Sequence, residues 1–119
     1  MRYQYFTMSE FACRCGCKTG KMNPLLIALL DNIRAQIKLP ITVRSGIRCS
    51  RHNAHINGHS NSQHVPDSLG VSNAADISSS DMGRLFAACT RTFLSIGDGR
   101  EHGFVHVDMR SDKKRLWKY

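Results

Sequence analysis

Apolar residues recur at spacings of three and four in two segments of the chain, and this spacing predicts two amphipathic helices. At the start of the first, Asn23 suits the N-cap and Pro24 the first helical position, while Pro40 supplies a stop. The second spans about residues 80–95, after a capping cluster of serines and Asp81. The apolar positions are Leu26, Leu29, Leu30, Ile33 and Ile37 in the first and Leu85, Phe86, Cys89, Phe93 and Leu94 in the second.

Short β-branched or apolar runs between the helices predict strands. They cover residues 41–46, 74–77 and 104–109. A short helix is expected over residues 50–56 and a tight turn at residues 97–99, and Trp117 is expected to cover an edge of the core. The pattern predicts an α+β fold, a small antiparallel sheet packed against two main helices, in one domain spanning residues 1–119.

Composition and charge narrow the class of protein. Hydrophobic residues make up 41% of the chain, which favours a folded domain over a disordered one. Seventeen Lys and Arg residues against nine Asp and Glu residues give a formal charge of +8, which favours an anionic partner such as nucleic acid, a membrane surface or a cell-wall polymer. Residues 1–6 contain no run typical of a signal peptide, and no stretch is long enough to span a bilayer. We therefore expect synthesis in the cytoplasm.

The five cysteines are an odd number and do not form the paired C-x-x-C spacing of a zinc ribbon. Cys13, Cys15 and Cys17 alternate in one loop, while Cys49 and Cys89 lie far away in the sequence. Without a signal peptide there is little reason to expect a disulfide framework, so structural thiols are favoured. A second metal cluster and a Cys17–Cys49 bridge remain alternatives.

Three side chains form a candidate zinc site. His106 lies on a predicted strand, His64 follows a polar loop, and Asp76 interrupts a short apolar run. Singly, each suits an ordinary structural role; together they supply the imidazole and carboxylate ligands of a catalytic zinc, whose fourth position holds water. No helical H-E-x-x-H motif occurs, so the site must be assembled from separate segments. The histidines at positions 52, 55 and 59 are better explained as solvent-facing.

Five short motifs, in this order, resemble the zinc D-Ala-D-Ala carboxypeptidase family. That family includes phage endolysins that cleave L-Ala-D-Glu bonds and shares its fold with hedgehog signalling domains. The resemblance covers nearly the whole chain, and the order is more specific than any single motif. The motifs are Ser9-Glu10-Phe11-Ala12-Cys13, Ser45-Gly46-Ile47-Arg48-Cys49 with His52-Asn53, Ser62-Gln63-His64, Ala74-Ala75-Asp76-Ile77 and Phe104-Val105-His106-Val107-Asp108.

Carried over by position, the resemblance implies a role for each matching residue. The zinc ligands would be His64, Asp76 and His106. Arg48 would hold the substrate carbonyl or carboxylate, which suits a planar, permanently charged guanidinium. Ser62 would hydrogen-bond the peptide, and Asp108 would orient a ligand or help transfer protons.

The chain departs from the family pattern at two points. The usual His-x-x-Gly-x-Ala-x-Asp spacing is shorter than the stretch between His64 and Asp76, so residues around 67–71 must loop out and Asp67 becomes a rival ligand. We keep Asp76 because its sequence context is intact. Where many members carry the general base this chain has Gly103, and the nearest carboxylate is Glu101, beside His102.

The resemblance implies zinc-dependent hydrolysis of amide bonds in peptidoglycan stem peptides, of the carboxypeptidase or endopeptidase type, with Glu101 or a substitute as base. It also implies a monomeric phage or prophage lysis protein that reaches the cell wall through a holin or on a phage particle. A catalytically weak zinc-containing wall-binding module is the main alternative. A nucleic-acid-binding protein is disfavoured because the basic residues are dispersed and no aromatics lie between them.

Overall fold

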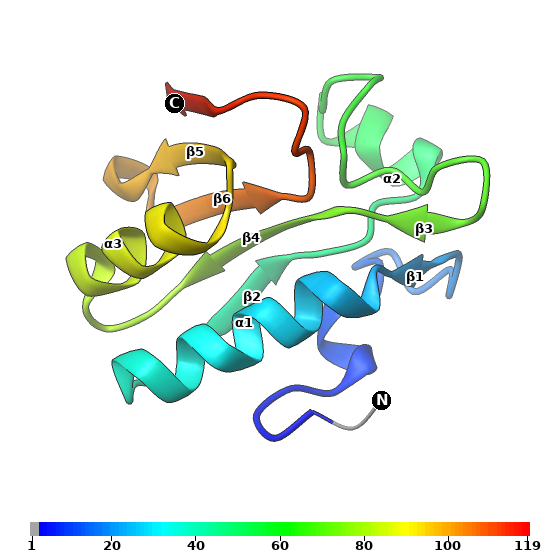
Figure 1. Ribbon diagram of the computed structural model, residues 1–119. Helices are drawn as coiled ribbons and strands as arrows, with labels where there is room; N and C mark the ends of the chain where they lie inside the picture. Colours follow the sequence, from blue (N-terminus) through cyan, green and yellow to red (C-terminus); the bar gives the residue numbers. More distant parts are fainter. Residues whose placement is uncertain (1–2) are drawn as a thin grey trace.

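The computed structural model describes residues 3–119, so Met1 and Arg2 of the N-terminal stretch lie outside the described part (Figure 1). Among the described residues, no helix combines the length and apolar character needed to cross a membrane. The elements in chain order are η1 (Met8–Phe11), β1 (Lys21–Met22), α1 (Pro24–Ile37), β2 (Thr42–Ser45), α2 (Ser50–His55), β3 (Val71–Ser72), β4 (Ala74–Ser78), α3 (Met82–Thr92), β5 (Ser95–Gly99), η2 (Arg100–His102), β6 (Phe104–Asp108) and β7 (Arg115–Lys118).

A five-stranded sheet in the order β2-β4-β6-β5-β7 forms the centre of the molecule. Its neighbours are antiparallel except for β5 and β7, which are parallel, and β1 and β3 form a separate parallel pair. Figure 1 shows α1 running along the sheet, with α3 beside β5 and β6. The predicted α+β class is confirmed, and the parallel pairings are additions to it.

The two central strands separate a core face from an open face. Ala75 and Ile77 of β4 and Val105 and Val107 of β6 are fully buried, in one core with the apolar side chains of α1 and α3. Because successive side chains of a strand point to opposite faces, the residues between them face away from the helices. The alternation in the sequence therefore places Asp76 and His106 on the same face of the sheet.

The first helix begins and ends as its sequence predicts. The side-chain oxygen of Asn23 accepts a hydrogen bond from the backbone N–H of Leu25 at 2.9 Å, and Pro24 occupies the first turn, where no amide proton is required. Lys38 ends the helix in a left-handed conformation with φ of 58°, and its N–H bonds to the carbonyl of Arg34. The helix contributes five buried side chains to the core, namely Leu26, Ile27, Leu30, Ile33 and Ile37.

The predicted turn at residues 97–99 is wrong, because these residues belong to strand β5. A Cβ atom on Gly97 would lie 2.6 Å from Cε2 of Tyr119 and 2.8 Å from the ring of Trp117, so glycine is needed for close contact with these rings. Trp117 lies against His106, with ring centroids 5.2 Å apart, and not at the core edge where it was expected. Glycine in this segment therefore indicates close side-chain packing and not a change of chain direction.

Candidate metal centre

The candidate site is built on a row of residues that crosses the open face of the sheet. Asp76 of β4 is directly opposite His106 of β6, and His106 is opposite Gly97 of β5. The row continues to Ser45 at one end and Trp117 at the other. Because strands pair at fixed spacing, the sheet itself sets the distance between the carboxylate and the imidazole.

The third group, His64, arrives from the loop between α2 and β3 and is 1% exposed. Its Nδ1 lies 2.7 Å from the carbonyl oxygen of Gly46, so Nδ1 carries the proton and donates it there. Its own carbonyl accepts the backbone N–H of Arg48 at 3.0 Å. These bonds hold the ring so that Nε2 faces Oδ1 of Asp76 at 3.2 Å.

The three groups converge on one point. Nε2 of His64 lies 3.2 Å and Nδ1 of His106 lies 3.0 Å from the same oxygen, Oδ1 of Asp76. Ligand atoms from all three residues lie within 4.8 Å of one another. Ligands at about 2.0 to 2.1 Å from a tetrahedral zinc ion are separated by roughly 3.3 Å, so the donor set and its spacing fit such an ion. The arrangement needs only small shifts to admit the metal.

The other nitrogen of His106 is held on the far side of the ring. Nε2 lies 2.9 Å from Oδ2 of Asp108, whose side chain is fully buried. Arg110 donates to both oxygens of this carboxylate, each at 2.9 Å. Asp108 therefore orients the imidazole so that Nδ1 faces Asp76, and the burial of Asp108 behind the ring separates it from any substrate.

The electrostatics favour an ionised carboxylate between two imidazoles. Burial opposes ionisation of Asp76, but hydrogen bonds with His106 and His64 outweigh it and lower the pKa of the carboxyl group well below its usual value. Burial lowers the pKa of His64. Burial also opposes protonation of His106, yet its bonds to Asp108 and Asp76 prevail and raise its pKa. Protonation of His106 and metal binding at its Nδ1 therefore compete with one another.

Arg48 lies at the edge of this centre. Its Nη2 is 3.9 Å from Oδ2 of Asp76, and its Nη1 donates to Oδ1 of Asn53 at 3.2 Å. Its buried Nε has no hydrogen-bond partner among the described residues. An unpaired buried donor is costly in a folded protein, so this group would gain a partner if an acceptor on a ligand reached it. Asn53, buried and bonded to the carbonyl of His59, fixes the guanidinium from behind.

A pocket of about 360 Å³ opens beside His106. Besides His106 it is lined by His59, Asn61, Ser62, Gln63, Arg110, Trp117 and Tyr119. Ser62 also accepts the backbone N–H of His64 at 3.2 Å, so it links the pocket to the metal group. The roles of Trp117 and Tyr119 were not predicted. Trp117 lies in β7 and Tyr119 directly follows this strand, and their spacing of two is the signal that both face one side of the sheet.

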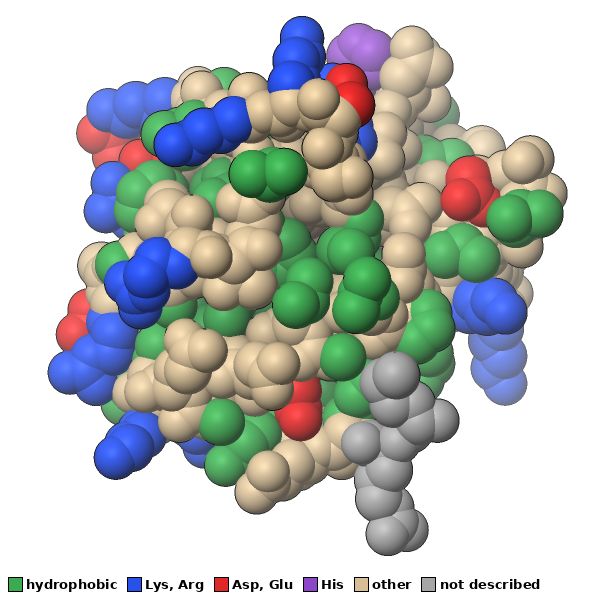
Figure 2. Space-filling model, in the orientation of Figure 1, with side chains coloured by type: hydrophobic (Ala, Val, Ile, Leu, Met, Phe, Trp, Pro, Cys, Tyr) green, Lys and Arg blue, Asp and Glu red, His purple; other side chains and the backbone are tan. Residues whose placement is uncertain are grey.

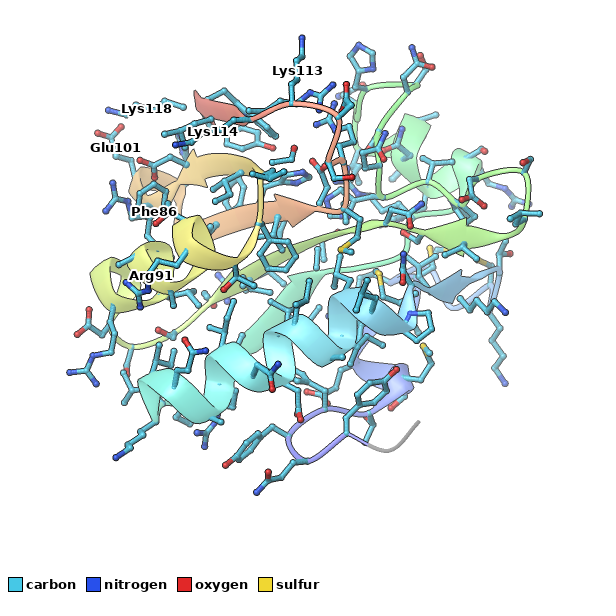
Figure 3. The ribbon with its side chains drawn as sticks, in the orientation of Figure 1. Phe86, Arg91, Glu101, Lys113, Lys114 and Lys118 are labelled. Atoms are coloured by element: carbon cyan, nitrogen blue, oxygen red, sulfur yellow. The ribbon has the colours of Figure 1, made fainter. Side chains whose placement is uncertain are left out.

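The remaining predicted groups lie elsewhere. Glu101 is 70% exposed and pairs with Lys118, its Oε1 3.2 Å from Nζ, and Figure 3 shows both at the same edge of the molecule. Asp67, the rival ligand, accepts backbone N–H groups of Leu69 and Val71 in an exposed turn. His52, His55 and His102 are outside the candidate metal group, and of the surface histidines only His59 lines the pocket.

Two imidazoles and one carboxylate brought together in this way are a candidate metal-binding group of the kind that metallopeptidases use. The family model for Peptidase M15 matches residues 4–108, so the chain belongs to the Peptidase M15 family of zinc-dependent metallopeptidases. The match includes both histidines, Asp76 and the whole of β6. No curated protein gives a significant match to the chain.

Proposed function

We propose that this protein hydrolyses amide bonds in peptidoglycan stem peptides, with one zinc ion held by His64, Asp76 and His106. The observation that carries the proposal is the convergence of Nε2 of His64 and Nδ1 of His106 on one oxygen of Asp76, at 3.2 and 3.0 Å. When bound, zinc supplies the Lewis acidity that amide hydrolysis requires. The family supplies the peptidase class, and the wall peptide is our inference from the motifs.

Arg48 and Ser62 would bind the substrate. Arg48 carries a permanent charge 3.9 Å from Asp76, and its Nε has no partner among the described residues, which suits binding of a peptide carbonyl or a terminal carboxylate. Ser62 lines the pocket and can donate its hydroxyl proton to the peptide while it accepts the N–H of His64. The rings of Trp117 and Tyr119 would form the opposite wall of the pocket.

Charge supports an anionic polymer as the larger partner. Arg110, Lys113, Lys114 and Arg115 line a groove that shares Arg110 and Trp117 with the pocket. Figure 3 shows Lys113 and Lys114 on the segment that leads into β7, and Figure 2 shows further basic side chains along the edges of one face. With a formal charge of +8, the protein would be retained near an anionic wall. We propose a monomer that serves as a phage or prophage lysis protein and reaches the wall through a holin or on a phage particle.

The general base must come from outside the pocket. Of the described residues, none that lines the pocket carries a carboxylate. Glu101 could act only after breaking its ion pair with Lys118, and Asp108 is enclosed by His106 and Arg110. We therefore keep Glu101 as the predicted base and assign Asp108 to the positioning of His106. The same observation favours a second candidate function, a zinc-containing wall-binding module with weak catalysis.

Incubation with purified peptidoglycan separates the two functions. For a peptidase we expect new amino groups and shortened stem peptides by mass spectrometry, abolished by a chelator and restored by zinc. His106→Ala should lose the activity, whereas Asp112→Asn, which alters an exposed carboxylate in a separate pair with Arg115, should retain it. Zinc binding and co-sedimentation with the wall, without released peptide, would establish the binding module. The masses of the products identify the bond that is cut.

A further inference from the structure

A second group of potential metal ligands lies outside the candidate metal centre. It consists of Cys13, Cys15 and Cys17 from the loop after η1 and Cys49 at the N-cap of α2. Cys13 and Cys49 are 36 positions apart in the sequence, yet the backbone N–H of Cys49 donates a hydrogen bond to Sγ of Cys13. All four sulfur atoms lie within 4.8 Å of one another. We refer to these residues as the cysteine cluster.

The backbone of the loop explains how alternating cysteines meet at one point. The N–H of Gly16 bonds to the carbonyl of Cys13 at 3.0 Å, which closes a tight turn. Gly16 has a φ of +80°, a conformation that glycine adopts without strain. The turn folds the chain back between Cys15 and Cys17, so the Cys-x-Cys-x-Cys pattern can present three thiols to the same side.

The distances between the sulfurs fit a shared metal ion better than disulfide bonds. Sγ of Cys15 lies 3.4 Å from Sγ of Cys13 and 3.6 Å from Sγ of Cys49. A disulfide requires about 2.05 Å. Four sulfurs at about 2.3 Å from a tetrahedral zinc ion are separated by roughly 3.8 Å. Both separations are within about 0.4 Å of this value.

The surroundings of the cluster also suit thiolates. The backbone N–H of Cys49 points to Sγ of Cys13 at 3.4 Å, and that of His52 points to Sγ of Cys49 at 3.3 Å. Such donors stabilise thiolate ligands. Four thiolates and one Zn²⁺ leave a net negative charge, and Arg51, His52 and His55 lie around the same cavity as Cys15, Cys17 and Cys49.

We propose that Cys13, Cys15, Cys17 and Cys49 bind a structural zinc ion, separate from the ion of the candidate metal centre. Four protein ligands leave no position for water, so this site is closed and holds the fold together. It joins the loop after η1 to the residue that directly follows Arg48. The N–H of Ile47 reinforces this connection through a bond to the carbonyl of Phe11 at 2.8 Å. The second ion thus fixes the segment that carries the proposed substrate-binding arginine.

Zinc content measured by elemental analysis tests the proposal. Protein purified without added chelator should contain two zinc ions per chain, and Cys17→Ser and His106→Ala should each contain one. Cys17 is exposed, so its replacement removes a ligand with little loss of packing. The matched control is Cys89→Ala, which removes a buried thiol of α3 far from the cluster in sequence and should keep both ions. One zinc ion in the wild type, unchanged by Cys17→Ser, would overturn the proposal.

X-ray absorption of the His106→Ala variant tests the ligands directly and does not depend on how a cysteine variant folds. The remaining zinc should show only sulfur neighbours, at about 2.3 Å. Nitrogen or oxygen neighbours would refute a tetrathiolate site, as would disulfides among these cysteines or bound iron in place of zinc. Because the zinc of this variant is independent of peptide hydrolysis, the result stands whether or not the proposed peptidase activity is found.

Discussion

Asp108→Asn should weaken zinc binding although Asp108 does not touch the proposed metal position. The carboxylate accepts Nε2–H of His106 at 2.9 Å and receives two bonds from Arg110 at 2.9 Å. An asparagine can keep the bond to His106 through its oxygen, but its NH₂ group then faces the donors of Arg110. Loss of such outer partners typically lowers metal affinity by about 10- to 100-fold. This corresponds to about 1.4 to 2.7 kcal/mol.

Competition with a zinc-binding dye measures the change in Kd. The loss of zinc affinity should be largest near pH 8 and smaller near pH 6. Asp108 also raises the pKa of His106, so at pH 6 protons compete with zinc more strongly in the wild type than in the variant. Asp112→Asn is the control. It alters another carboxylate–arginine pair, with Arg115, in which the Asp112 side chain is 67% exposed. A folded Asp108→Asn protein whose Kd stays within a factor of three of the wild type at pH 8 would refute the orienting role.

Three further predictions concern the metal, the proposed base and the aromatic rings. Zinc should raise Tm more at pH 8 than at pH 6, because acidification protonates His106, whose pKa is already raised; equal shifts in differential scanning calorimetry would contradict this. Glu101→Gln should lower hydrolysis by about 100-fold or more if Glu101 leaves its ion pair with Lys118 to act as the proposed base; activity within about tenfold of the wild type would remove it from that role. Gly97→Ala should displace Trp117 and Tyr119, raise KM and lower the free energy of unfolding in urea by about 1 to 3 kcal/mol; an unchanged KM would refute the role of the rings.

Local signals in the sequence predicted most of the elements. Asn23, Pro24 and the apolar spacing identified α1, and short β-branched or apolar runs identified β2, β4 and β6. Helix α3 is shorter than predicted: it ends at Thr92, and Phe93 adopts an extended conformation. These features are encoded within a few residues of each other, which is why they can be derived from one sequence.

Features that depend on contacts between distant segments were harder to derive. Gly97 was interpreted as part of a turn because the rings that require a glycine come from β7, which follows much later in the chain. The solvent-facing position of Glu101 depends on Lys118 in the same way. The grouping of His64, Asp76 and His106 was predicted by resemblance and sequence context, while their spacing could come only from the pairing of β4 with β6 and the anchoring of His64 to Gly46.

Asp76 and His106 lie on paired strands, whereas His64 lies in a loop, and these two settings differ in how well they tolerate inserted residues. One residue inserted into β4 or β6 would reverse its alternation, sending Asp76 or His106 into the core and apolar side chains into water. The chain between His64 and β4 is less constrained, because it contains an exposed turn at residues 67–70. Bonds to Asp67 and the short pairing of β3 with β1 hold the base of this turn. An insertion at Ser68 or Leu69 should therefore be tolerated, which makes this turn the natural place to graft a peptide tag or a wall-targeting sequence.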